Sequence, residues 1–154
     1  MRGVVIHRML ELLTKDACPN PAIIPGQLGL QVEPAELEQC WDEARRVWQH
    51  PLLQPFFDPA YFKQAFNEVP VLYQQQNSTV HGIIDRLVVT DTEALVIDYK
   101  THRHATEGNL RHIAEPYFTQ LGYYREGIQQ IWPTRSVRAL LIFTACAGVV
   151  ELPV

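Results

Sequence analysis

Three ionisable residues interrupt an otherwise apolar part of the sequence, GIIDRLVVTDTEALVIDYKTHR, which spans residues 82–103. Asp85, Asp98 and Lys100 stand at positions where a buried strand would carry valine. Carboxylates are the ligands that a hard cation such as Mg²⁺ prefers, and such an ion usually keeps water molecules for chemistry. The residue types therefore indicate a metal centre with a lysine beside it, provided that the fold brings the two carboxylates together.

The pattern around these residues predicts that Asp85 and Asp98 face each other. Residues 80–89 and 94–100 have the composition of strands, and TDTE between them predicts a hairpin. A two-residue loop and a four-residue loop give the same register, which places Asp85 directly opposite Asp98 with β-carbons ~4.5–5.5 Å apart. Side chains alternate along a strand, so Lys100 shares the face of Asp98.

Two like charges at this separation destabilise a sheet unless a positive charge lies between them. Lys100 supplies one charge against two, whereas a divalent cation balances both. The spacing therefore predicts a metal site. The spacing alone also fits a simpler arrangement, in which the Asp and Lys side chains only solvate the edge of a strand.

The remaining pattern indicates how these strands are supported. Apolar residues at helical spacing predict helices over residues 2–15 and 33–50, and Pro116 begins a helix that runs to about residue 132. Further strands are predicted over residues 65–75, 137–144 and 148–154, with connections over 18–30, 51–62 and 101–115. This order predicts an α/β fold with a mixed central sheet flanked by helices. We expect a single domain over 1–154, with a helical part over about 1–64 and a sheet–helix core over about 65–154.

Composition excludes several classes of protein. The 154 residues are 47% hydrophobic and 19% charged, as in soluble globular domains, and we expect neither a signal peptide nor a membrane span. The three cysteines are widely spaced, which argues against a disulfide framework and favours a reducing cytoplasm. The net charge of −4 argues against nucleic-acid binding by bulk charge alone. An anionic partner would need a bound metal or a local basic cluster.

The succession of motifs resembles a known family. GIIDRL followed by VIDYKT resembles the core of the PD-(D/E)xK nuclease superfamily, and more narrowly the RecB/AddA-type nuclease domain at the C-terminus of bacterial UvrD/RecB-like helicase–nucleases. Further motifs follow in the family's order: VVIHRMLELL with His7, NEVPV with Glu68, and QLGYY with Gln120 and Tyr124. The likeness extends from His7 to about Gly127. Ile84 replaces the proline of the superfamily's name, as is common in RecB-type members.

This resemblance implies a restriction-endonuclease-like core and a deoxyribonuclease that depends on Mg²⁺ or Mn²⁺, an exonuclease with or without endonuclease activity, in DNA repair and recombination. It implies that Asp85, Asp98, His7 and the backbone carbonyl of Tyr99 hold the metal. A lone histidine beside an apolar stripe is otherwise usually a core or boundary residue. Lys100 would orient or activate the attacking water and stabilise charge on the phosphate. Glu68 would hold a water or a second ion, unless it is simply an exposed glutamate of a strand.

Supporting contacts are also implied by the family. Gln120 and Tyr124 share a helix face with Tyr117 and are expected to contact DNA or to steady Lys100, although an aromatic stripe at this spacing is more often core. Arg86 and Arg103 belong to a basic group expected to contact phosphates, unless it is simply solvated. The rest of that group is His102, His104, Arg111 and His112.

Partners follow from what the sequence lacks. No GxxxxGK[ST] motif is present, so we expect a helicase motor elsewhere in a longer bacterial, cytoplasmic chain, together with a second helicase–nuclease subunit. The expected substrate is single-stranded DNA ends or unwound strands. Only Cys146 lies near the C-terminus, so no iron–sulfur cluster is expected. Two alternatives remain: a catalytically inactive module for DNA binding or protein docking, and a stand-alone nuclease similar to restriction or Holliday-junction enzymes.

Overall fold

The structure is a computed structural model that describes residues 1–154. Its α-helices are α1 (Arg2–Lys15), α2 (Ile24–Leu28), α3 (Pro34–Gln49), α4 (Gln54–Phe57), α5 (Leu110–Ala114) and α6 (Phe118–Ile131). Its strands are β1 (Gln64–Gln75), β2 (Ser78–Val89), β3 (Glu93–Lys100), β4 (Ser136–Phe143) and β5 (Gly148–Glu151). Short 3-10 helices are η1 (Pro21–Ile23), η2 (Pro51–Leu53), η3 (Pro59–Tyr61) and η4 (Glu115–Tyr117). None of the helices combines the length and apolar character needed to cross a membrane.

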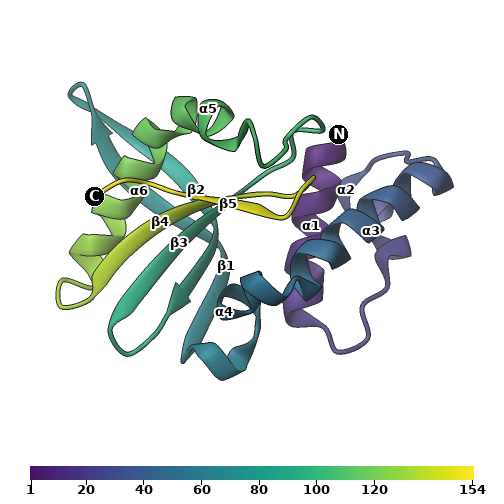
Figure 1. The fold of residues 1–154 in the computed structure, drawn as a ribbon, viewed down its shortest axis with the longest axis horizontal. Coiled ribbons are helices and arrows are strands. Elements are labelled where there is room, and N and C mark those ends of the chain that lie inside the picture. The colour runs from purple at the N-terminus through teal and green to yellow at the C-terminus, as the bar shows by residue number, and fades with distance from the viewer.

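The strands form one five-stranded mixed sheet in the order β1-β2-β3-β4-β5 (Figure 1). Only β3 and β4 run parallel, and every other neighbouring pair is antiparallel. A parallel pair needs a long crossover connection, which α5 and α6 provide between these two strands. The predicted α/β fold with a mixed sheet flanked by helices is therefore confirmed.

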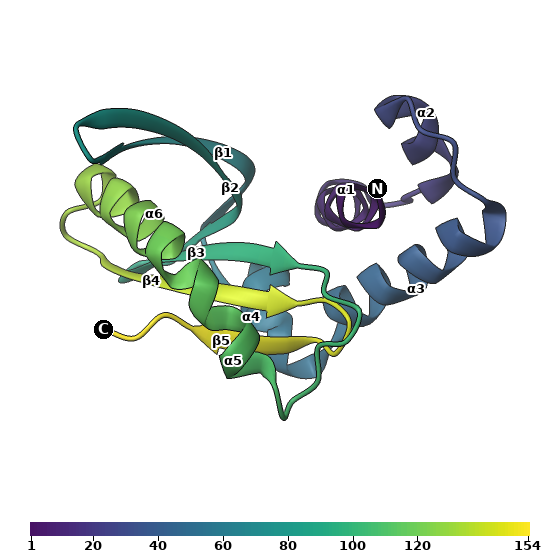
Figure 2. The same cartoon turned by 90° about the horizontal axis from the view of Figure 1, so that it is seen from above.

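Each face of the sheet has its own apolar core, because side chains alternate along the strands. On one face α1 and α3 pack against residues such as Ile97 and Leu140. On the other face α6 packs against residues such as Val96 and Leu141. Figure 2 shows α1 end-on, with α3 on one side of it and the β1–β2 hairpin curving away on the other. The sheet thus holds α1 and α6 on opposite faces.

The β1–β2 hairpin changes face along its length. Ala65 of β1 belongs to the core beneath α1 and α3, whereas Val69, also odd-numbered, packs in the core beneath α6. Between them Glu68 adopts a left-handed conformation with φ of 53°, which is uncommon for a residue with a side chain. The pairing register is the same on both sides of Glu68, so the strand rotates there without inserting a residue.

Several short elements were not predicted. The connection after α1 contains η1 and α2, which is capped at its C-terminus by Gly29 with φ of 65°, a left-handed conformation that glycine adopts readily. The segment predicted as a loop over 101–115 contains α5, which buries Leu110 and Ala114. Pro116 lies in η4, and α6 begins two residues later, at Phe118. These elements are too short to show a periodic apolar pattern.

Candidate active site

Asp85 and Asp98 come together at the end of the β2–β3 ladder. Val89 pairs with Ala94, as predicted, and the ladder continues as far as the pair of Arg86 with Ile97. Asp85 lies one residue beyond this pair, and its side-chain oxygen Oδ2 accepts the backbone N–H of Tyr99 at 2.8 Å. The aspartate side chain therefore takes a ladder hydrogen bond that a backbone carbonyl would otherwise accept, which holds the carboxylate against β3.

The other side of Asp85 faces Glu68. The β1–β2 register continues through this position, yet neither Glu68 nor Asp85 joins the ladder. Glu68 is exposed, and partial burial together with the charge of Asp85 raises the pKa of its carboxyl group. Glu68, Asp85 and Asp98 therefore occupy corresponding positions on three adjacent strands, at the point where the hairpin changes face.

His7 reaches this acidic group from α1. Its Nε2 lies 3.1 Å from Asp85 Oδ2, and its Nδ1 lies 2.6 Å from the carbonyl oxygen of Gly3. Burial disfavours the charged imidazole, but the hydrogen bond and the negative charge of Asp85 outweigh it and raise the pKa of His7 to about 9. Burial acts against ionised Asp85 as well, yet its contacts with His7 and Tyr99 hold the pKa of this carboxyl below its usual value.

Asp98 is in the opposite electrostatic situation. Its side chain is buried beside Asp85, and burial and this like charge raise the pKa of Asp98 to about 7 even though Lys100 opposes the shift. Lys100 Nζ lies 2.9 Å from Asp98 Oδ2. The two aspartates are therefore unequal, with Asp85 the more easily ionised.

Tyr117 is the neighbour of Lys100. The Nζ atom of Lys100 lies 4.0 Å from the centre of the Tyr117 ring, and the Tyr117 hydroxyl lies 2.7 Å from Nε2 of His102. A ring at this distance attracts an ammonium group through its quadrupole. Tyr117, which comes from η4 just before α6, is thus the aromatic residue over the Lys100 ammonium group.

The two residues of the QLGYY motif differ in their surroundings. Gln120 is exposed on α6. Tyr124 is buried, and burial raises the pKa of its hydroxyl to about 12. Its ring lies against Gly82, where an added β-carbon would come within 2.5 Å of the ring. Tyr124 therefore packs under the hairpin near the site, as the core alternative anticipated.

Arg86, which we expected to contact phosphates, is buried. Arg86 is 3% exposed, and its guanidinium donates to the carbonyl of Phe56 at 2.8 Å and to the side chain of Asn67 at 3.0 Å. It also lies over the rings of Phe57 and Phe62. Such burial leaves no surface for a phosphate.

Arg103 is exposed in the loop after β3, beside a hollow that Arg2 and Arg46 also line. Arg103, unlike Arg86, is therefore open to a ligand.

A cleft of about 610 Å³ opens onto Glu68 and Asp85. His7, Glu68 and Asp85 form one part of its wall, while Val4 and Leu28 are its apolar members. The cleft therefore lies between α1, α2 and the β1–β2 hairpin, and its wall carries three carboxylates, those of Glu11, Glu68 and Asp85, beside the imidazole of His7.

Comparison with known proteins gives the family. A profile described as the PD-(D/E)XK nuclease superfamily matches residues 1–151. The chain belongs to the PD-(D/E)XK nuclease superfamily. The resemblance in the sequence motifs is thereby confirmed.

The chain is also similar in sequence to bacterial proteins that are named as combined helicases and nucleases. An ATP-dependent helicase/nuclease subunit of Oceanobacillus iheyensis is 31% identical over 77 residues, which are 48% of this chain and 6% of that protein. The protein of the same name from Ligilactobacillus salivarius is 39% identical over 74 residues, again 48% of this chain and 6% of that protein. The chain thus matches only a small part of each relative's length.

Similarity to solved structures is distant. Protein VC1899 from Vibrio cholerae has a TM-score of 0.36 and 13% sequence identity, and the match covers 93% of this chain and 42% of that one. A TM-score this low supports no conclusion about this chain.

The superfamily implies a divalent metal, and the residues at the site fit one in their chemistry. In this structure no group of three or more His, Cys, Asp or Glu side chains is arranged so that it could hold a metal ion. The contact of His7 Nδ1 with the Gly3 carbonyl, however, leaves Nε2 facing Asp85, the orientation that supporting hydrogen bonds give to metal-binding histidines. Asp98 is a buried carboxylate beside another carboxylate, and a cation would offset the repulsion that raises its pKa.

Proposed function

We propose that this chain is a nuclease domain that hydrolyses phosphodiester bonds of DNA with the help of Mg²⁺ or Mn²⁺. The observation that carries the proposal is the grouping of His7, Asp85, Asp98 and Lys100 at one point, contributed by α1, β2 and β3. These side chains combine hard anionic ligands, an imidazole and an ammonium group, which is the set that metal-assisted attack on a phosphate needs.

Each residue has a distinct part in this proposal. Asp85, Asp98, His7 and the Tyr99 carbonyl would hold the metal, which when bound activates water and offsets the charge of the phosphate. Lys100 would orient the attacking water and stabilise negative charge on the phosphate, and the Tyr117 ring limits where its ammonium group can lie. Glu68, open to the cleft, would hold a further water or ion. Arg103 and Gln120 are exposed and would contact the DNA backbone.

The substrate and setting are proposed from the relatives. Their names combine a helicase and a nuclease, and their length allows a motor in the same chain. We therefore propose that residues 1–154 act as one nuclease unit on single-stranded ends or on strands unwound by that motor, in bacterial DNA repair and recombination. A cytoplasmic location and a second helicase–nuclease subunit complete the proposal.

Cleavage of labelled single-stranded and duplex DNA tests this function. We expect the 154-residue chain to cleave single strands in Mg²⁺ or Mn²⁺ and to stop when a chelator is added. Asp98→Ala and Lys100→Ala should each reduce the rate at least about 100-fold, the usual cost of losing an electrostatic group at a reacting centre. Asp91→Ala is the matched control, because Asp91 is an exposed aspartate in the turn between β2 and β3 and is paired with Lys63.

Two outcomes would contradict the proposal. Cleavage that persists in chelator and in both variants would exclude this site as its source. Binding of DNA without cleavage in either metal would instead support a catalytically inactive nuclease fold that serves for DNA binding or docking.

A further inference from the structure

A buried carboxylate lies outside the acidic group and is not assigned in the proposed reaction. Glu43, on α3, is 8% exposed, and apart from Asp98 it is the only buried acidic residue. Its Oε1 accepts from the guanidinium of Arg2, and its Oε2 accepts from the hydroxyl of Thr144 at 2.7 Å. A buried carboxylate is costly unless its oxygens are hydrogen-bonded, and both oxygens of Glu43 are.

The two partners of Glu43 hold consecutive backbone carbonyls. Arg2 Nη1 donates to the carbonyl of Thr101, and the Thr144 backbone N–H donates to the carbonyl of Lys100 at 2.9 Å. These carbonyls stand where β3 ends and the chain leaves the sheet. One carboxylate on α3 therefore anchors, through two intermediaries, the backbone of the residue that carries the ammonium group.

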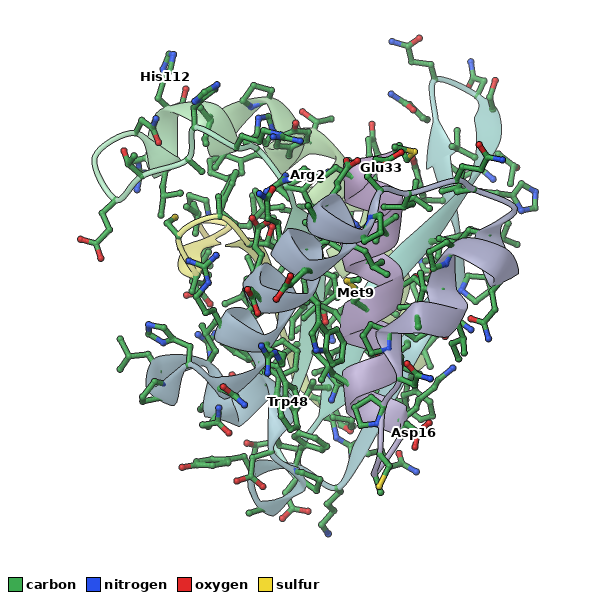
Figure 3. All side chains as sticks on the ribbon, turned by 90° about the vertical axis from the view of Figure 1, so that its right-hand side faces the viewer. Arg2, Met9, Asp16, Glu33, Trp48 and His112 are labelled. Carbon is green, nitrogen blue, oxygen red and sulfur yellow. The ribbon has the colours of Figure 1, made fainter.

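The same contacts locate the first turn of α1. Arg2 is the first residue of this helix, and a positive charge at a helix N-terminus interacts unfavourably with the helix dipole. The position of Arg2 is therefore stabilised by its specific contacts and not by the helix. A β-carbon on Gly3 would lie 3.0 Å from the Thr101 side-chain oxygen, which shows how closely this turn approaches the end of β3. The Gly3 carbonyl in turn contacts His7. Figure 3 shows Arg2 and Asp16 at the two opposite ends of α1.

We propose that Glu43 is a positioning residue of the nuclease site. Through Arg2 and Thr144 it fixes the end of β3 against the first turn of α1, so that Lys100 and the proposed metal ligand His7 are held at the same site. The inference rests on the proposed function. A displacement of about 1 Å in a reacting group can lower a rate about 100-fold, so a rigid anchor at this junction matters to catalysis.

Glu43→Gln tests the proposal, because it keeps the side-chain volume and leaves Arg2 without its counter-charge. We expect kcat on single-stranded DNA in saturating Mg²⁺ to fall about 10- to 100-fold with KM changed by less than about 2-fold. The Thr144 amide should exchange with solvent about 10-fold faster, because its bond to Lys100 opens more often. Arg46→Gln is the matched control: Arg46 lines the same hollow on α3 but donates only to the carbonyl of Asp42.

Thr144→Val provides a second variant if Glu43→Gln does not fold, since it removes the hydroxyl that donates to Glu43 at 2.7 Å and to the Lys100 carbonyl at 3.4 Å. It should lower kcat in the same direction, and when combined with Glu43→Gln it should add little, because both act through one network. Unchanged exchange at Thr144, or faster exchange with unchanged kcat, would overturn the role of Glu43. A wild-type chain that does not cleave DNA would overturn the proposed function itself, which is a distinguishable result.

Discussion

Asp85 on β2 lies opposite Asp98 on the neighbouring strand β3. Asp85 does not join the strand ladder, and its carboxylate instead accepts the backbone N–H of Tyr99 at 2.8 Å. This contact fixes one carboxylate beside the other, next to the point at Glu68 where the side chains of the β1–β2 hairpin switch from one face of the sheet to the other. It also separates their properties, since Asp85 has a lowered pKa and Asp98 a raised one. A pair with unequal pKa values is common at functional sites, because burial and like charges are arranged there to shift them.

The raised pKa of Asp98 predicts how the metal-free chain responds to pH. The folded-state pKa of about 7 exceeds the ordinary value of 3.8, so the stability associated with Asp98 is complete below about pH 4 and is lost as the pH rises through about 7. Asp98→Asn removes that loss. In chelator at about pH 8 we expect it to be more stable than wild type by about 1 kcal/mol or more, a rise of roughly 2–4 °C in Tm per kcal/mol.

Thermal melts in chelator at about pH 5 and about pH 8 measure this effect. The gain from Asp98→Asn should shrink at the lower pH, where wild-type Asp98 is protonated in the folded state. An equal change in Tm at both values would contradict the raised pKa of Asp98 in the folded state.

Tyr117 should matter to the reaction through its ring more than through its hydroxyl. Cation–π contacts contribute about 0.5–2 kcal/mol, so we expect Tyr117→Ala to lower the single-turnover cleavage rate by about 3- to 30-fold. Tyr117→Phe keeps the ring beside Lys100 and should stay within about 3-fold of wild type. Tyr123→Ala is a suitable control, because Tyr123 stacks on Tyr73 of the hairpin. Equal losses in Tyr117→Phe and Tyr117→Ala would assign the effect to the contact with His102 instead.

Gly82 should be intolerant of a side chain. A β-carbon there would lie 2.5 Å from a carbon of the Tyr124 ring, which is held in the core beneath α6. We expect Gly82→Ala to reduce the free energy of unfolding by about 1–3 kcal/mol, as overpacking usually does.

The contrasting variant is Gly122→Ala on α6, where nothing lies within 4 Å of an added β-carbon. It should raise stability by up to about 1 kcal/mol, because alanine favours a helix. Denaturant unfolding of both variants decides the point, and a Gly82→Ala protein as stable as wild type would contradict the close packing of Tyr124.

Arg86 and Arg103 should separate stability from DNA binding. Arg86→Met leaves the Phe56 carbonyl and the Asn67 side chain without their donor, so we expect a loss of about 1–3 kcal/mol in stability and no change in DNA affinity. Arg103→Met should leave Tm unchanged, weaken binding of single-stranded DNA and reduce the slope of log K against log salt by about 0.7. Titrations at several salt concentrations, with melts of the same samples, would reveal the reverse assignment if Arg86→Met alone altered the slope.

The main strands and long helices of this fold, and the centre of its site, could be predicted from local pattern. Asp85 and Asp98 are expected together because turn length and side-chain alternation set the register of one hairpin. The burial of Arg86 follows from the same alternation, since it must face away from its neighbour Asp85, and the expected contact of Arg86 with phosphate overlooks this consequence.

Glu43 could not be found in this way. Its partners Arg2 and Thr144 are 41 and 101 residues away in the sequence, and only the packing of α1 and α3 on the sheet brings them together. The change of face at Glu68 is likewise a tertiary effect, which a regular strand pattern does not indicate.

The most direct measurement is anomalous diffraction from crystals of the chain soaked in Mn²⁺, with Asp98→Asn crystals treated in the same way. We expect one strong peak in wild type, in contact with Asp85, Asp98, Nε2 of His7 and the Tyr99 carbonyl, and a much weaker peak in the variant. A manganese ion bound elsewhere, or no ion between the two aspartates at a concentration that supports cleavage, would contradict the central claim.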